Sequence, residues 1–341
     1  MGTTGSTPLR VGLVGYGLAG SAFHAPIIAA LPQFELAVIV ARGEDKIAAA
    51  RARYPEALVI QSVDQLVGMG LDLAVIATPN QTHYELARQV IRAGINVVVD
   101  KPLATSSEQA AALVSQAEGA GVLICCYQNR RWDGDFLTVE QLIGQGRLGK
   151  VARFESRFER FRPSIKPGWK ERPGPGSGIL WDLGPHVIDQ AIHLFGEPEE
   201  VYSEIRTVRP GAQVDDNDFI ALIHPNGVTS HLSVSAIAGA PGPRFRVLGT
   251  RGAYLKDGLD PQEAALRAGG DPAAQSWGTE DEGLYGLLCK GDEQQVVPTL
   301  PGDYKQFYFR MAAAILGEGP VPVDPRTTIS VLRIIENALR G

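Results

Sequence analysis

A lysine stands directly after an apolar run in the segment 97–102, which reads VVVDKP and contains Lys101. Such a run is typical of a buried parallel strand, and open α/β sheets bind their ligands beyond the carboxyl ends of these strands. An ammonium group at that edge can hydrogen-bond a substrate hydroxyl and stabilise an alkoxide as it forms, which assists hydride loss without a metal ion. A surface lysine before a turn is the alternative, and the spacing alone does not separate the two.

A second pattern pairs Asp182 with His186, four residues later, and Asp189 with His193 repeats the spacing. Residues four apart share one face of a helix, although we expect the Gly-Pro step between them to end one helix and begin another at Pro185. A histidine that titrates near neutrality beside a carboxylate can act as a general acid or base. A polar stripe packed at a domain junction is the alternative, and we assign His193 to it. No metal is expected, because Asp-x-x-x-His without further ligands nearby is a poor zinc motif.

A glycine pattern, G-x-G-x-x-G, lies between a predicted strand and a predicted helix near the start of the chain. In that position its first glycine permits a tight turn, its second lets the backbone approach a pyrophosphate, and its third lets the helix pack closely on the strand. The helix N-terminus then faces the phosphates. The pattern therefore predicts a dinucleotide-binding loop formed by Gly15, Tyr16, Gly17, Leu18, Ala19 and Gly20.

The end of the second predicted strand bears on which nicotinamide cofactor binds. An acidic residue there would bind the ribose 2′-hydroxyl and repel a 2′-phosphate, but the segment 40–43 reads VARG. Arg42 could instead bind the 2′-phosphate through a charge-assisted bond, so NADP is favoured and NAD stays open. Glu44 and Asp45 weaken this argument unless they belong to the start of the next helix. A solvated loop arginine is the alternative for Arg42.

The elements that must position these residues fall into two kinds. Up to about residue 127, short apolar runs alternate with helical segments, which predicts a doubly wound parallel sheet covered on both faces. The expected strands are 9–15, 34–40, 57–61, 71–77, 95–99 and 122–127, and the expected helices are about 19–31, 44–54, 84–93 and 106–119.

After about residue 150, longer and partly alternating strand patterns predict hairpins and a mainly antiparallel sheet. The expected strands are 151–161, 200–208, 218–224, 228–238 and 244–248, with helices at 187–195 and 327–339 and with loops and short helices over 257–302. The predicted fold class is thus α/β, with a Rossmann domain over residues 1–127 and an α+β domain over 128–341.

Composition limits the classes of partner. The 341 residues carry 32 basic and 38 acidic side chains, so the formal net charge is −6, and no basic block is present. Nucleic acid and anionic membrane surfaces are therefore not expected as partners. The sequence contains no run of about 18 apolar residues, so no membrane span is predicted.

The start of the chain lacks a secretory pattern, and residues 1–6 are expected to form a disordered leader. Cys125, Cys126 and Cys289 form neither a disulfide framework nor a zinc pattern, which favours a reducing, cytoplasmic compartment.

Together, the glycine loop, the Asp100-Lys101-Pro102 triplet and the pair Asp182 and His186 resemble the Gfo/Idh/MocA family of oxidoreductases. The similarity runs from Arg10 to Arg340. The family triplet is usually Glu-Lys-Pro, so aspartate at position 100 is a conservative departure. The segments 15–26, 129–133, 181–186, 260–263 and 276–278 are similar to the branch that holds NADP-dependent scyllo-inositol dehydrogenases.

This resemblance implies roles for particular residues. It implies catalysis by Lys101 with Asp182 and His186, in which His186 is the acid or base, and a C-terminal open-faced sheet that forms homodimers or homotetramers. Beyond the glycine loop and Arg42, the cofactor contacts it implies are Thr78, Pro79, Asn80, His83, Asp100, Lys101, Asn129 and Trp169. The substrate contacts it implies are Lys101, Asn129, Arg130, Asp182 and His186. Arg130 could instead form an interdomain salt bridge, Trp169 could be a packing residue, and His83 could simply start a helix.

The activity favoured by these observations is reversible oxidation of a secondary hydroxyl on a cyclic polyol or sugar, with hydride passing to NADP. One alternative keeps the fold but uses NAD in a glycosidase that recycles its cofactor. Another is a dinucleotide-sensing protein, which would need the catalytic lysine or histidine to be missing. Fold analogy supports the class of reaction more than any particular sugar.

Overall fold

The computed structural model describes residues 7–340, so the predicted leader at 1–6 lies outside the described residues. The chain forms two compact units that are not continuous in sequence. The first unit contains the described residues up to 127 together with 262–277 and 304–328, and the second contains 128–261, 278–303 and the remaining C-terminal residues. The division into domains 1–127 and 128–341 stays a prediction. Within residues 7–340, no helix has both the length and the apolar character to cross a membrane.

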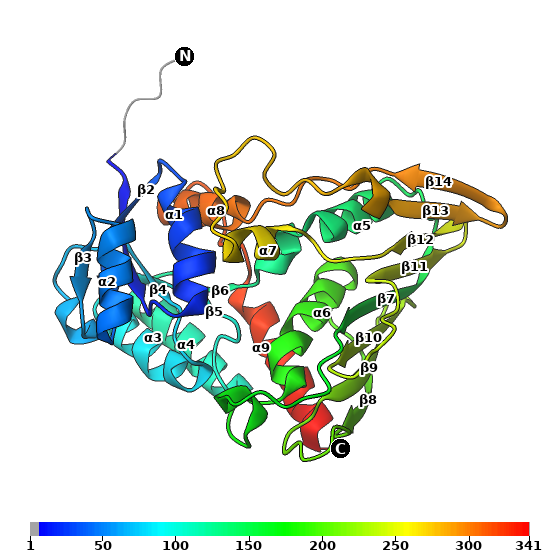
Figure 1. Ribbon diagram of the computed structural model, residues 1–341, viewed down its shortest axis with the longest axis horizontal. Coiled ribbons are helices and arrows are strands. Elements are labelled where there is room, and N and C mark those ends of the chain that lie inside the picture. Colours follow the sequence, from blue (N-terminus) through cyan, green and yellow to red (C-terminus); the bar gives the residue numbers. More distant parts are fainter. Residues whose placement is uncertain (1–6, 341) are drawn as a thin grey trace. The chain divides into compact units, whose positions relative to one another are not determined.

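The first unit is built on a six-stranded sheet whose strands pair in parallel, in the order β3-β2-β1-β4-β5-β6 (Figure 1). Its strands are β1 (Leu9–Val14), β2 (Phe34–Val40), β3 (Leu58–Ile60), β4 (Leu73–Ile76), β5 (Asn96–Asp100) and β6 (Ile124–Tyr127). Its helices are α1 (Ala25–Ala29), α2 (Glu44–Arg53), α3 (His83–Arg92), α4 (Ser107–Ala120), α7 (Gln262–Arg267) and α8 (Lys305–Ile315). The central strands are fully buried because both faces are covered, and this confirms the predicted Rossmann-type sheet.

The helix expected over about 19–31 is divided in the structure. A π-helical turn, Ala19–His24, comes first and α1 follows it. Pro26 has no N–H group, so it cannot donate to the carbonyl four residues back, and the N–H of Ala25 instead reaches Gly20 five residues back. The wider turn carries the side chain of His24 into the interior, where it is fully buried.

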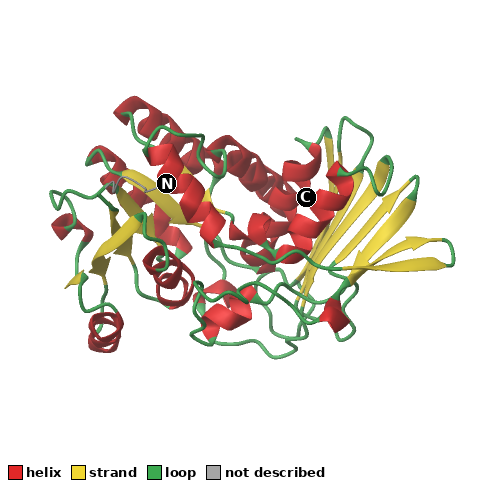
Figure 2. Ribbon diagram, turned by 90° about the horizontal axis from the view of Figure 1, so that it is seen from above, coloured by secondary structure: helices red, strands yellow, loops and turns green. Residues whose placement is uncertain are grey.

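The second unit contains an eight-stranded sheet in the order β14-β13-β12-β11-β7-β10-β9-β8. Its strands are β7 (Val151–Glu159), β8 (Glu200–Arg206), β9 (Asn217–Ile223), β10 (Thr229–Ser235), β11 (Phe245–Gly249), β12 (Gly252–Lys256), β13 (Gly286–Lys290) and β14 (Glu293–Val297). Every pairing is antiparallel except that of β7 with β10, so the predicted mainly antiparallel sheet is confirmed. Figure 2 shows helices on one face of this sheet, and its other face is left uncovered by the described residues.

Two expectations need correction. The segment 257–302, expected as loops and short helices, does contain the short helix α7, but it also contributes the hairpin β13–β14, which turns at Gly291 in the left-handed region. The residues of β14 are mostly exposed and polar, so no alternation marked it as a strand. The second error is the break expected at Pro185, because α6 runs without interruption over Ile179–Phe195. Burial of its apolar side chains against β7, β9 and β10 offsets the cost of an internal proline, which is about 3 kcal/mol.

Two further α-helices among residues 7–340 are α5 (Gly134–Gly144), which sequence analysis missed, and α9 (Pro325–Arg340), which corresponds to the helix expected at 327–339. The first residue of α5, Gly134, packs closely against the backbone of Leu300, which leaves no room for a Cβ atom at this position. Such a long-range contact leaves no signal in the local sequence.

Candidate active site

The glycine loop follows β1 and has one open backbone position. Gly15 is in the left-handed region, at φ 101°, and a Cβ atom there would lie 2.6 Å from the carbonyl oxygen of Ala77. A Cβ atom on Gly20 would lie 1.9 Å from the carbonyl oxygen of Gly15. A Cβ atom on Gly17 would meet nothing within 4 Å. Gly15 and Gly20 are therefore required by the fold, whereas Gly17 exposes backbone that a ligand can approach.

Arg42 lies just beyond β2, where its Nε donates a 3.3 Å hydrogen bond to the carbonyl oxygen of Gln61 in an exposed position. Gly43 adopts φ 87° before α2, and Glu44 and Asp45 occupy the first turn of that helix. Glu44 and Asp45 therefore belong to α2, where the helix dipole favours acidic side chains, and not to the tip of β2. The loop after β2 therefore presents a guanidinium group.

The carboxyl end of β5 carries the Lys101 turn. The backbone N–H of Lys101 donates to the Asp100 carboxylate at 2.9 Å, and the Lys101–Pro102 peptide is cis. The neighbouring segment after β4 contains Thr78, Pro79 and Asn80 and leads into His83, the first residue of α3.

His83 joins the segments that follow β4 and β5. Its Nδ1 lies 2.7 Å from the carbonyl oxygen of Pro102, and its Nε2 lies 2.8 Å from that of Thr78. The ring is fully buried, and this burial lowers the pKa of the imidazole. His83 does begin a helix, and its two contacts also hold the Lys101 turn against the Thr78 segment. Its role as a cofactor contact stays a prediction.

In the second unit, Asp182 and His186 lie one turn apart on α6 and therefore share a face of the helix. Asp182 Oδ1 accepts a 2.6 Å hydrogen bond from Lys170 Nζ, in a partly exposed ion pair. The ammonium group of Lys170 also lies 5.7 Å from the ring centre of Trp169, and both residues belong to a short 3₁₀ turn. Lys170 was missed by sequence analysis, and its place directly after Trp169 is the only local signal that could have indicated it.

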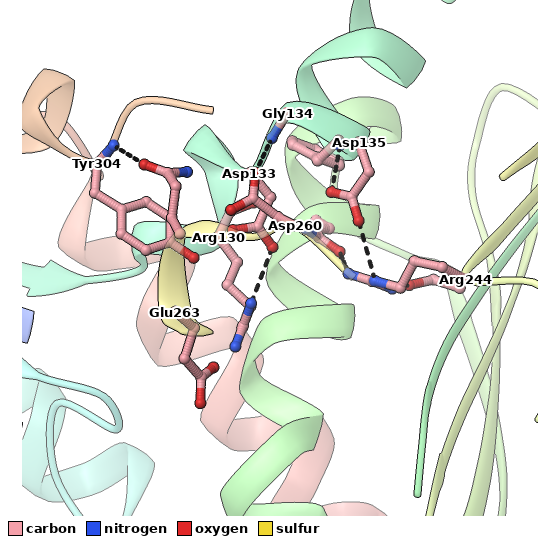
Figure 3. Close-up of polar contacts among 12 residues, drawn as sticks. Arg130, Asp133, Gly134, Asp135, Arg244, Asp260, Glu263 and Tyr304 are labelled. Atoms are coloured by element: carbon pink, nitrogen blue, oxygen red, sulfur yellow. Dashed lines mark hydrogen bonds and ion pairs between the residues drawn. The ribbon is translucent and has the colours of Figure 1, made fainter. Parts of the chain in front are cut away.

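Arg130 approaches the same region of the second unit as His186. The guanidinium carbon of Arg130 lies 4.6 Å from the centre of the Phe158 ring, and the His186 ring lies 6.3 Å from that centre. Arg130 is buried, and its Nη1 donates to Asp133 at 3.1 Å, as Figure 3 shows. Asn129 begins the same 3₁₀ turn. The roles of Asn129 and Arg130 in binding substrate stay predictions.

The second Asp-x-x-x-His pair of α6 is occupied by structural contacts. Asp189 forms a buried bidentate ion pair with Arg131, with both nitrogen–oxygen distances 2.7 Å, and His193 lies 3.0 Å from Glu140. A buried bidentate pair fixes the orientation of α6 against the turn that carries Arg131. The structure therefore gives the second pair a structural role, and the catalytic role of Asp182 and His186 stays a prediction.

Family models match both parts of the chain. The model described as "Oxidoreductase family, NAD-binding Rossmann fold" matches residues 9–128, and the model of the GFO/IDH/MocA C-terminal domain matches residues 136–255.

Relatives in other organisms match over nearly the whole length. The oxidoreductase YdgJ of Escherichia coli is 41% identical, over 97% of this chain and 95% of that protein. The scyllo-inositol 2-dehydrogenase (NADP(+)) IolW of Bacillus subtilis is 34% identical, over 98% of this chain and 93% of that protein.

Solved structures agree with these matches. The oxidoreductase YvaA of Bacillus subtilis superposes with a TM-score of 0.92 at 34% identity, covering 97% of this chain and 95% of that one. An oxidoreductase from Yersinia pestis gives a TM-score of 0.91 at 39% identity, covering 98% and 94%. The chain therefore belongs to the Gfo/Idh/MocA family of oxidoreductases, with an NAD(P)-binding Rossmann domain in its N-terminal part.

Proposed function

We propose that the protein reversibly oxidises a secondary hydroxyl of a cyclic polyol or sugar, with NADP as the hydride acceptor. The observation that carries the proposal is the position of Lys101 at the carboxyl end of β5, in the same unit and at the same strand edge as the glycine loop. The similarity to a scyllo-inositol 2-dehydrogenase supports the class of substrate.

The residues have distinct parts in the proposed reaction. Lys101 hydrogen-bonds the reacting oxygen and stabilises negative charge on it. His186 accepts the hydroxyl proton during oxidation and returns it during reduction. Asp182 orients His186 or a substrate hydroxyl, and Asn129 and Arg130 bind other parts of the substrate. The bound nicotinamide supplies the hydride acceptor.

The preference for NADP over NAD rests on the loop after β2. The glycine loop binds the pyrophosphate, Arg42 pairs with the 2′-phosphate, and Thr78, Pro79, Asn80 and Trp169 contact the remainder of the cofactor. No acidic residue at the tip of β2 repels that phosphate. The uncovered face of the eight-stranded sheet is proposed to bind a second copy of the chain, because exposed apolar side chains such as Tyr202 and Ile223 lie on it beside its charged groups.

The test is to follow formation of reduced nicotinamide with NADP or NAD and a panel of inositols and aldoses. Wild-type protein is expected to reduce NADP with at least one of them, and Lys101→Met is expected to lower the rate about a hundredfold to a thousandfold. Lys150→Met, which replaces an exposed lysine elsewhere, is the matched control and should be neutral. If nothing in the panel reduces either cofactor, the polyol assignment fails. Tightly retained NAD with glycoside cleavage would instead indicate a glycosidase.

A further inference from the structure

A chain of three polar side chains leads from the interior of the first unit to the Lys101 turn. Tyr308 Oη on α8 lies 2.6 Å from Nδ1 of His24 in the π-helical turn. Nε2 of His24 faces Oδ1 of Asp100 at 3.8 Å, at the end of β5. The same Oδ1 accepts the backbone N–H of Lys101 at 2.9 Å. The function proposed above gives His24 and Tyr308 no part.

The inner two members of this chain are sealed from solvent. Tyr308 and His24 are fully buried, and the Asp100 side chain is 20% exposed. Aromatic rings enclose them, with the Tyr127 ring 4.3 Å and the Tyr308 ring 6.2 Å from the His24 ring. Because both inner groups are buried, Tyr308 Oη and His24 Nδ1 satisfy each other, whereas Nε2 of His24 has no hydrogen-bond partner among residues 7–340 and faces only Asp100.

The direction of the hydrogen bonds follows from the chemistry of the groups. Burial raises the pKa of Tyr308 well above its ordinary value, so its hydroxyl keeps the proton. In the neutral imidazole of His24 this hydroxyl donates to Nδ1, which leaves the remaining ring proton on Nε2. That N–H group faces the carboxylate of Asp100 at 3.8 Å, which is an electrostatic approach and too long for a hydrogen bond. Tyr308 thereby selects the tautomer of His24 that can stabilise an ionised Asp100.

Asp100 is held in its charged form. Burial alone would raise the pKa of this carboxyl, but the His24 imidazole, which faces it at 3.8 Å, together with Lys101 and His83, holds the pKa below its ordinary value. The titratable groups that face Asp100 are therefore His24 from the π-helical turn, His83 from α3, Tyr308 from α8 and the adjacent Lys101. Because Lys101 favours the carboxylate, the carboxylate in turn favours the ammonium form of Lys101.

We propose that His24 and Tyr308 are positioning residues for Lys101, which they orient through the ionised carboxylate of Asp100. They fix one carboxylate oxygen against the Lys101 backbone, and they keep a negative charge beside its ammonium group while substrate binds. This inference rests on the role proposed above for Lys101.

Substitutions at position 24 separate two effects of His24: the N–H group that it presents to Asp100 and the packing of its ring in the interior. In His24→Asn the amide can replace Nδ1 opposite Tyr308 but is too short to approach Asp100, whereas in His24→Gln the longer side chain can place an amide N–H where Nε2–H faces Asp100. Tyr308→Phe deletes only the hydroxyl and keeps the ring packing, so it serves as a second variant if His24→Asn does not fold. Tyr127→Phe is the matched control, since it removes a hydroxyl from the same aromatic group and leaves Tyr308, His24 and Asp100 unchanged.

The test measures the titration of Asp100 itself by carboxyl ¹³C NMR of aspartate-labelled protein, with the signal assigned from Asp100→Asn. His24→Asn is expected to move the Asp100 midpoint upward by about one pH unit, with a smaller shift in Tyr308→Phe, restoration in His24→Gln and no shift in Tyr127→Phe. In parallel, His24→Asn should lower kcat about tenfold with little change in KM, and move the acid limb of the kcat/KM profile upward.

Two results distinguish failure of this inference from failure of the proposed function. An Asp100 midpoint that is unchanged in both His24→Asn and Tyr308→Phe, in protein that folds, overturns the inference whatever the activity. A kcat that is unchanged while the midpoint shifts also overturns it, because Asp100 would then not govern Lys101. If the wild-type protein reduces no cofactor with any polyol, the proposed function fails. A shifted Asp100 midpoint would still show that His24 and Tyr308 act on the Asp100 carboxylate.

Discussion

Substituting Gly17 by alanine should separate cofactor binding from folding. A Cβ atom at Gly17 meets nothing within 4 Å, so the free energy of unfolding is expected to change by less than about 0.5 kcal/mol. The added methyl group would, however, occupy the space through which a pyrophosphate approaches the backbone. Loss of one hydrogen bond to that charged group costs about 1.5–3 kcal/mol, which corresponds to roughly tenfold to hundredfold weaker binding.

The assay is a fluorescence titration with NADPH, paired with urea unfolding of the protein without cofactor. Gly20→Ala is the matched control, because its Cβ atom would lie 1.9 Å from the carbonyl oxygen of Gly15 and no side chain can move to relieve that clash. That variant should lose several kcal/mol of stability as well as affinity. Undiminished NADPH affinity in stable Gly17→Ala protein would show that the cofactor phosphates do not approach the backbone at Gly17.

Three further predictions concern charged side chains. Arg42→Ala should raise KM for NADP about tenfold and leave KM for NAD unchanged, which initial rates with both cofactors would show; an equal effect on both would contradict a 2′-phosphate contact. Lys170→Met removes the cation 2.6 Å from Asp182 and should lower kcat/KM about threefold to tenfold, while Lys170→Arg retains most activity; equal loss in both variants would count against the ion pair. Burial, with the nearby Asp215 carboxylate, raises the pKa of Asp218 to about 9. A carboxyl whose pKa is raised on folding stabilises the protein fully below the unfolded pKa of about 4, and this stability is lost as pH rises toward 9. Asp218→Asn should therefore raise Tm at pH 8 but hardly at pH 4. A gain in Tm that is the same at both pH values would contradict this prediction.

Local sequence predicted the parts of the fold whose signal is local. The run before Asp100 is continuously apolar because β5 is buried on both faces, and the glycine pattern marks the turn after β1 because Gly15 and Gly20 have no room for a side chain. In the second unit, the alternating runs gave β7, β9 and β10 because one face of the sheet is covered and the other is not.

Elements determined by long-range packing were missed. Pro185 indicates a helix break, yet α6 continues through it because apolar side chains on either side are buried against the sheet. The strand β14 is specified by pairing with β13 and not by its own exposed, polar residues. Intrinsic propensity was overridden by tertiary contacts in both cases.

The candidate site shows the same division. Motif spacing indicated Lys101, Asp182 and His186 without any structure, but it could not indicate which groups surround them. His24 and Tyr308 are separated by 284 residues in sequence, and their contact exists only because α8 returns to the first unit.

The proposed reaction depends on direct hydride transfer from the carbon of a secondary hydroxyl to a cofactor that is then released. Its most direct test supplies a polyol carrying deuterium at the carbon of its secondary hydroxyl, with NADP, and examines the released nucleotide by mass spectrometry. We expect one deuterium per molecule of reduced NADP in wild-type protein and none above background in Lys101→Met. Consumption of substrate without a labelled, released nucleotide would overturn direct transfer and would indicate a reaction in which the cofactor is recycled on the enzyme.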